Sequence, residues 1–177
     1  MKFLTPIYII ITVVRFIDCS VITFYGNDEK SYAKYEPWQS FSNGLLKFRF
    51  KSTEPNGLLL YADDQYKSKG AGNFLKLKLV NKQLIVRIQI SYSIGVDEYQ
   101  SQVKKMVLGN NLNDNRYHYV ELKRENEKIE IKLDSKLSRY IPPGNGQILN
   151  INSSVFLGGV PDDLKPVMDR LILDEKK

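Results

Sequence analysis

The chain has 177 residues, of which 42% are hydrophobic and 26% charged, and its net charge at pH 7 is +6. This length and composition allow one globular domain with an apolar core and exclude two domains of ordinary size. A single cysteine and a single histidine exclude a disulfide framework, a thiolate metal site and a two-histidine metalloprotease centre. The basic charge favours polyanionic partners, which outside a cell are sulfated glycans or acidic protein faces rather than nucleic acid.

Residues 1–20 have the features of a secretory signal peptide. Lys2 supplies a positive start, an apolar run extends from Ile7 to Val14, and a small residue, Cys19, lies near the expected cleavage point. The apolar run is too short to span a bilayer. We therefore predict a signal peptide over 1–20 and one domain over 21–177, secreted or at the cell surface, with no membrane span in this chain. The alternative interpretation is a buried N-terminal strand.

Alternation of apolar and polar residues is the dominant pattern after the leader. It predicts a strand over 45–51, a hairpin over 74–90 with its turn at 81–83, and a second hairpin over 117–135. A period of two is typical of strands with one face in a core and the other in water. The residues expected to face the core are Leu46, Phe48, Phe50, Leu75, Leu77, Leu79, Ile88, Ile90, Val120, Leu122, Ile129, Ile131 and Leu133. Short strands separated by regular turn signals predict an all-β sandwich or barrel.

His118 is the residue that most invites an enzymatic interpretation, because an unperturbed histidine titrates near physiological pH. It lies two residues before Val120, and therefore on the same, apolar face of its strand. No serine or cysteine nucleophile elbow accompanies it. We therefore expect a structural, hydrogen-bonded histidine.

Pairs of acidic residues are the other candidates for catalysis, since sandwich folds host glycosidases that use two converging carboxylates. All of these pairs fall in predicted turns, where acidic residues usually contact solvent, and the geometry that catalysis requires is not indicated. The sequence therefore predicts a protein that is not an enzyme. The pairs are Asp63-Asp64, Asp97-Glu98, Glu125 with Glu127, and Asp162-Asp163.

Basic residues occupy the outward positions of several predicted strands. If those strands are neighbours, the side chains form a positive stripe that could bind heparan sulfate; the alternative is that they only provide solubility and protect sheet edges. The candidate glycan-binding residues are Lys47, Arg49, Lys76, Lys78 and Arg87. Separately, Asn152-Ser153-Ser154 is an N-glycosylation sequon at the start of a predicted strand.

Several segments resemble laminin G-like domains. They are "NGLLLYADD" followed by "GNFLKLKLVNKQLIVRI", then "NRYHYVELKR" with "IEIKLD", and finally "SVFLGGVPDD", and together they extend the resemblance from Phe24 to Asp163. The segment "YAKYEPWQS", in which Ala33, Tyr35 and Trp38 match, is similar to the opening of the N-terminal laminin G-like domain of invertebrate alpha-neurexins.

The resemblance implies a jelly-roll-like sandwich of two curved antiparallel sheets, here lacking its final strand and therefore C-terminally incomplete. It implies that the histidine is a framework residue. It also implies an extracellular, non-catalytic binding module of a neurexin-like cell-adhesion receptor, which engages protein ligands through a rim of loops. Binding of heparan sulfate or another glycan through the basic face is the alternative function.

The resemblance further implies the position of a calcium site, because some members of the family bind the ion at the loop rim. Carried over to this chain, the ligands are the side chains of Asn73 and Asn150 and the backbone carbonyls of Ile90 and Ile148. Asn73 replaces an aspartate, so the set carries no charge. Calcium affinity follows the number of charged ligands, and we therefore expect a degenerate site that binds calcium weakly or not at all.

Overall fold

A computed structural model shows an all-β sandwich, as the sequence predicted. The structure describes residues 6–11, 20–25, 31–38, 43–64, 72–95, 98–143, 145–149 and 151–165. Within these ranges the strands form two sheets in which all strand pairs are antiparallel. The same ranges contain no helix of the length and apolarity that crossing a membrane requires.

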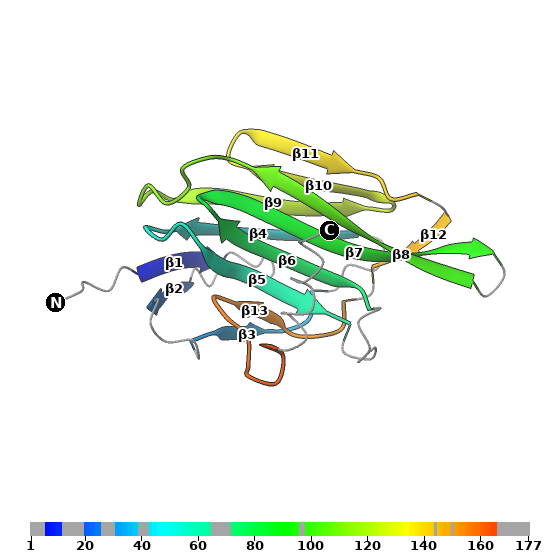
Figure 1. Cartoon of the computed structure of the whole chain (residues 1–177), viewed down its shortest axis with the longest axis horizontal. Coiled ribbons are helices and arrows are strands. Elements are labelled where there is room, and N and C mark those ends of the chain that lie inside the picture. The colour runs from blue at the N-terminus through cyan, green and yellow to red at the C-terminus, as the bar shows by residue number, and fades with distance from the viewer. Residues whose placement is uncertain are drawn as a thin grey trace.

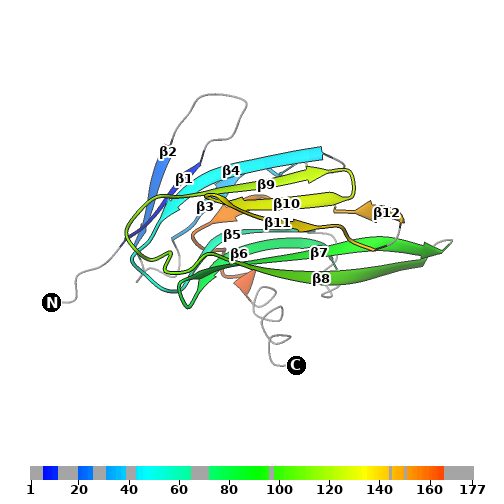
Figure 2. The same cartoon turned by 90° about the horizontal axis from the view of Figure 1, so that it is seen from above.

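One sheet has six strands in the order β11-β10-β9-β4-β1-β2. Figure 2 shows it as one layer, with the second sheet as the other. Its strands are β1 (Pro6–Ile11), β2 (Ser20–Tyr25), β4 (Asn43–Lys51), β9 (His118–Glu125), β10 (Lys128–Leu133) and β11 (Lys136–Tyr140).

The second sheet has seven strands in the order β12-β7-β6-β5-β13-β3, and β8 pairs with β7. The hairpin of β7 and β8 extends beyond the ends of the neighbouring strands (Figure 1). The strands of this sheet are β3 (Ala33–Tyr35), β5 (Gly57–Asp63), β6 (Phe74–Val80), β7 (Gln83–Gly95), β8 (Glu98–Leu108), β12 (Asn145–Ile148) and β13 (Val155–Leu157).

An apolar core lies between the two sheets, and every residue that the alternation predicted to face inward belongs to it or packs against it. Leu46 is partly buried against this core, and the other predicted residues are buried within it. Burial of each large apolar side chain stabilises the fold by about 1.5–3 kcal/mol. The predicted turn at 81–83 is also observed, since Asn81 and Lys82 both have positive φ, 48° and 68°, as a two-residue hairpin turn requires.

The predicted leader contains strand β1, which lies between β2 and β4. Ile9 pairs with Ile22 on one side and with Phe50 on the other. In the full chain, residues 6–11 therefore form a strand, which was the alternative to a signal peptide in the sequence analysis. Removal of residues 1–20 stays a prediction, as do the domain bounds 21–177 and the incomplete C-terminus.

Strand β2 has a second anchor that does not depend on β1. The ring of Phe24 packs directly on Gly158, so closely that a Cβ atom at Gly158 would lie 2.5 Å from the ring. Gly158 also has a φ of 75°, which favours glycine over any residue with a side chain. This contact joins the six-stranded sheet to the turn after β13.

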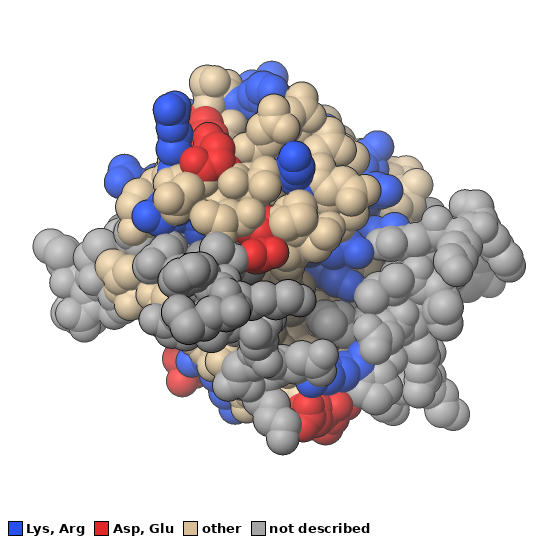
Figure 3. Space-filling view, turned by 60° about the vertical axis from the view of Figure 1, so that its left-hand side comes forward, with Lys and Arg blue, Asp and Glu red and all other residues tan. Residues whose placement is uncertain are grey.

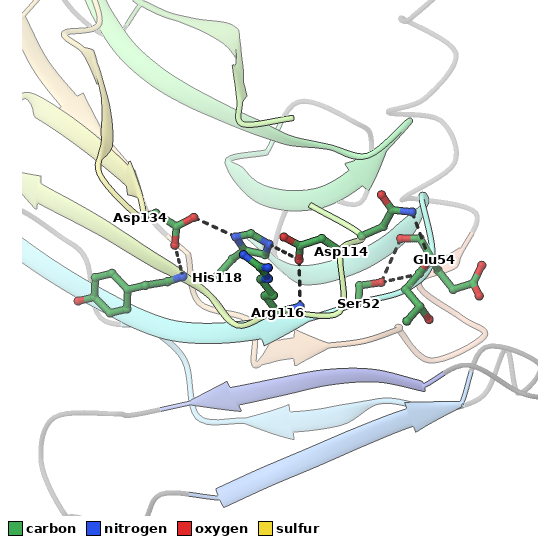
Figure 4. A network of polar contacts seen from close by, with 9 residues as sticks. Ser52, Glu54, Asp114, Arg116, His118 and Asp134 are labelled. Carbon is green, nitrogen blue, oxygen red and sulfur yellow. Dashed lines mark hydrogen bonds and ion pairs between the residues drawn. The ribbon is translucent and has the colours of Figure 1, made fainter. Parts of the chain in front are cut away.

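His118 is held by two carboxylates at one end of the sandwich. Its Nδ1 lies 2.9 Å from Asp134 and its Nε2 lies 3.1 Å from Asp114, as Figure 4 shows. The ring also packs against Phe50, with 5.4 Å between the ring centroids. The carboxylate of Asp134 accepts a hydrogen bond from the Tyr119 amide, and the Asp134 amide donates a hydrogen bond to the Tyr119 carbonyl. These contacts give His118 the structural role that the sequence predicted.

The packing of Phe24 on Gly158 gives a test of how the two sheets are joined. We expect Gly158→Ala to lower the free energy of unfolding by about 1–3 kcal/mol, because the added methyl group overpacks the contact and the φ is strained. Chemical denaturation of purified protein measures this change. In a Phe24→Leu background the added loss should be smaller; equal losses in both backgrounds would show that the ring does not limit the space at Gly158.

The His118 network predicts a dependence of stability on pH. Partial burial alone would raise the pKa of Asp114, but hydrogen bonds from the Arg116 amide and the His118 ring outweigh it, so the pKa lies below its ordinary value. Because the pKa of the folded state is lowered, the stabilisation is present above about pH 4 and is lost as the pH falls through the folded value. Asp114→Asn should therefore cost roughly 1 kcal/mol at pH 7 and much less near pH 2.

Denaturation at the two pH values, with exposed Asp163→Asn as a control, measures the difference. An equal cost of Asp114→Asn at both values would contradict the role of its charge. The control variant should unfold like the original protein throughout.

Candidate functional site

The end of the sandwich opposite His118 carries a rim with a fixed backbone. We define the rim as Asp63-Asp64, where β5 ends, Asn73, which precedes β6, and residues 151–154, which precede β13. The Ser153 amide donates to the Asp63 carbonyl over 3.0 Å, and the Asp63 amide donates to the Ser153 hydroxyl over 2.8 Å. The Asp64 amide donates to the Asn73 carbonyl over 2.9 Å. Three separate chain segments are thereby held together.

Below the rim, Tyr61 donates a hydrogen bond from its hydroxyl to Oδ2 of Asp63 over 3.0 Å. Burial, followed by the charge of Asp63 and this hydrogen bond, raises the pKa of Tyr61 well above its usual range. The phenol is therefore neutral and acts as a donor. The other carboxylate oxygen of Asp63, Oδ1, is buried and forms no hydrogen bond with any residue that the structure describes.

The structure brings together three of the four positions that resemblance assigns to calcium. Ile90 lies in β7, next to the pair formed by Ser91 and Ile148 of β12. Asn73 lies one residue before Phe74, which pairs with Gln89 on the other side of Ile90. Asn150 lies outside the described residues.

The described members of this set offer neutral oxygen atoms, and Asn73 is 4% exposed. No group of three or more histidine, cysteine or acidic side chains suited to a metal occurs among the residues that the structure describes. The fit to calcium is therefore partial, because the positions converge but lack a charged ligand.

The five predicted glycan-binding residues lie in two different sheets. Lys47 and Arg49 belong to β4 of the six-stranded sheet, where Lys47 forms an ion pair with Glu121 over 3.4 Å. On the face shown in Figure 3, Lys and Arg side chains form several separate groups with acidic side chains among them.

Glu121, the partner of Lys47, also accepts a hydrogen bond from Tyr119 over 2.7 Å. Burial and this contact raise the pKa of Tyr119 to about 12, and the contact lowers the pKa of Glu121.

The other three, Lys76, Lys78 and Arg87, lie in β6 and β7 of the seven-stranded sheet. They alternate with core residues, as predicted, but Lys76 is 2% exposed and Arg87 is 7% exposed. Tyr61, the strand partner of Lys76, belongs to a second apolar cluster with Phe156, Val160, Leu58 and Leu164. Binding of heparan sulfate by the five residues stays a prediction, and the structure divides them into two separate groups.

The acidic pairs considered for catalysis lie at separate turns. Asp63-Asp64 belongs to the rim, Glu125 ends β9 and Glu127 lies in the β9–β10 turn, and Asp162-Asp163 follows β13. Asp97 lies outside the described residues. The described pairs therefore do not converge on a common site.

Sequence reasoning missed the role of Ser153 in joining the rim. Its side chain is fully buried, and its partner, Asp63, is 90 residues away in the chain. A serine before a strand has no local signal that identifies so distant a partner.

Comparison with known proteins agrees with this architecture. A family model described as "Laminin G domain" matches residues 50–171. Neurexin 1 of Drosophila melanogaster is 30% identical over 138 residues, covering 76% of this chain and 7% of that protein. Neurexin-3a of Danio rerio is 24% identical over 133 residues, covering 75% of this chain and 8% of that protein. The chain thus spans less than a tenth of these relatives.

The fold is also found in a solved structure, domains LG4-5 of the mouse laminin alpha1 chain. The TM-score is 0.59 at 18% identity, over 76% of this chain and 33% of that chain. The predicted resemblance to laminin G-like domains of neurexins is confirmed by these matches. Since the family model matches more than half of the residues, the chain belongs to the laminin G domain family.

Proposed function

We propose that the chain is an extracellular, non-catalytic binding module of a neurexin-like cell-adhesion receptor, and that it binds a protein ligand through the rim. The family membership and the predicted leader support an extracellular binding role. The observation that carries the proposal is the fixed backbone of the rim, in which Asp63, Ser153 and the pair Asp64–Asn73 hold three segments in one arrangement. A preformed surface reduces the conformational entropy lost on binding.

Two other places on the described surface are occupied by contacts within the domain. At the opposite end, His118 forms hydrogen bonds with two carboxylates. On the outer face of the six-stranded sheet, Lys47 and Glu121 form an ion pair. At these two places the contacts join side chains, which must exchange them on binding, whereas the three hydrogen bonds that hold the rim are all donated by backbone amides.

A change of charge on the rim should weaken binding of the partner. We expect Asp64→Lys to reduce the affinity for a protein partner by about tenfold, or about 1.4 kcal/mol, because it reverses a charge at the proposed contact. The partner is first recovered by screening the folded domain against displayed extracellular proteins, and the affinity is then measured by surface plasmon resonance.

Lys136→Glu is the matched control, since it makes an equally large change of charge at the start of β11, beside the His118 end. Its affinity should stay within about twofold of the original. If Lys136→Glu weakened binding and Asp64→Lys did not, the ligand would bind elsewhere. Hydrolysis of an offered glycan that disappeared on changing one carboxylate would contradict a non-catalytic role.

The same rim should bind calcium weakly or not at all, so that the partner is bound without the ion. Isothermal titration should show no dissociation constant tighter than about 1 mM, since weak extracellular sites lie at 0.1–1 mM and this set is neutral. Asn73→Asp adds the missing charge and should strengthen binding. Asn110→Asp, beyond the end of β8, is the control and should not.

Saturable binding well below millimolar in the unaltered domain would contradict this expectation. Loss of such binding in Asn73→Ala would then identify the neutral set as a working site. Equal responses of Asn73→Asp and Asn110→Asp would instead show that the position carried over by resemblance is not a calcium ligand.

A further inference from the structure

The N-glycosylation sequon lies within the rim. Residues 149 and 151–154 belong to the connection from β12, which pairs with β7, to β13, which pairs with β5. Asn152 is therefore at the end of the sandwich where β5 ends and β6 begins. Sequence alone places the sequon only at the start of a strand, whereas the sheet topology places it beside Asp63 and Asn73.

The side chain of Asn152 is suitably presented for modification. Its neighbours Ile151 and Ser153 are 4% and 0% exposed, whereas Asn152 itself is partly exposed. Within the described part of the chain, no hydrogen bond engages its amide group. Ser153 is fixed by its contacts with Asp63, and this fixes the position from which a sugar would leave the surface.

We propose that Asn152 carries an N-linked glycan that covers the rim around Asp63-Asp64. This inference rests on the proposed function in one respect, the identity of the rim as the ligand-binding surface. A partner that uses this surface then binds the form in which Asn152 is unmodified more tightly than the glycosylated form. Glycosylation at this single position would thus regulate the access of the partner.

The modification is a group transfer from a lipid-linked oligosaccharide diphosphate of the secretory pathway. Nδ2 of Asn152 loses one proton and forms a bond to C1 of the first sugar. The bond from C1 to the diphosphate oxygen breaks, and its electron pair leaves with the lipid diphosphate. No oxidant or reductant takes part, and the backbone contacts of Ser153 are unchanged.

Occupancy is tested on the full chain, secreted from cultured eukaryotic cells by its own leader. Enzymatic removal of N-glycans should reduce the mass of the secreted protein. Asn152→Gln and Ser154→Ala, two different ways of removing the sequon, should both abolish the shift. A mass that does not change on enzyme treatment of the original chain would overturn the proposal.

Shielding of the rim is tested by labelling a cysteine introduced there. The sequence contains only one other cysteine, Cys19, which can be replaced so that it does not react. In a Cys19→Ser background, Asp64→Cys should react with a bulky maleimide polymer at least several-fold more slowly in the glycosylated chain than in the Asn152→Gln chain. Lys136→Cys, beside the other end, should react equally fast in both. Equal rates at Asp64→Cys would overturn the shielding.

These two readouts require no partner, so their failure can be distinguished from failure of the proposed function. If Asn152 is glycosylated and the glycan shields the rim, but no partner binds the rim, the proposed function is contradicted and the glycan proposal stands. If a partner is found, it should bind Asn152→Gln at least tenfold more tightly than the glycosylated chain. Equal affinity would overturn the regulatory role.

Discussion

Burial of alternate strand residues between two sheets is the interaction on which the rest of the structure depends. Phe48 and Phe50 on one sheet and Leu75 and Leu77 on the other belong to the same core. A slip of one residue in any of these strands would turn its apolar side chains to the wrong face. The core therefore fixes the register of the strands, and with it the place where each strand ends.

The two ends of the sandwich use this fixed register differently. At one end, Asp114 and Asp134 bind the two nitrogen atoms of His118, so the polar groups of that end bind one another. At the other end, Ser153 and Asp63 hold the backbone of the rim, while the amide of Asn152 has no hydrogen bond with another described residue. The first arrangement stabilises the fold, and the second presents groups to solvent in a defined geometry.

Alternation predicted the core, the two hairpins and the structural role of His118, because a period of two determines which residues share a face. It could not predict that Lys76 and Arg87 are buried, because the burial of an outward-facing residue depends on what packs on that face from elsewhere in the chain. Pairing between distant segments also explains why the sequence indicated neither the Ser153–Asp63 contact nor the place of β1 in the sheet. Family resemblance indicated Asn73 as a position in the loop rim, but the contacts that join it to Asp63-Asp64 and Ser153 required the structure.

The core fixes the backbone of the rim before any ligand binds. Amide hydrogen exchange of the free domain measures this. The amides of Asp63, Asp64 and Ser153 donate hydrogen bonds across the rim, so they should exchange nearly as slowly as those of the core strand β6. Exchange at the rate of an unstructured peptide at these three positions, with β6 still protected, would contradict the account.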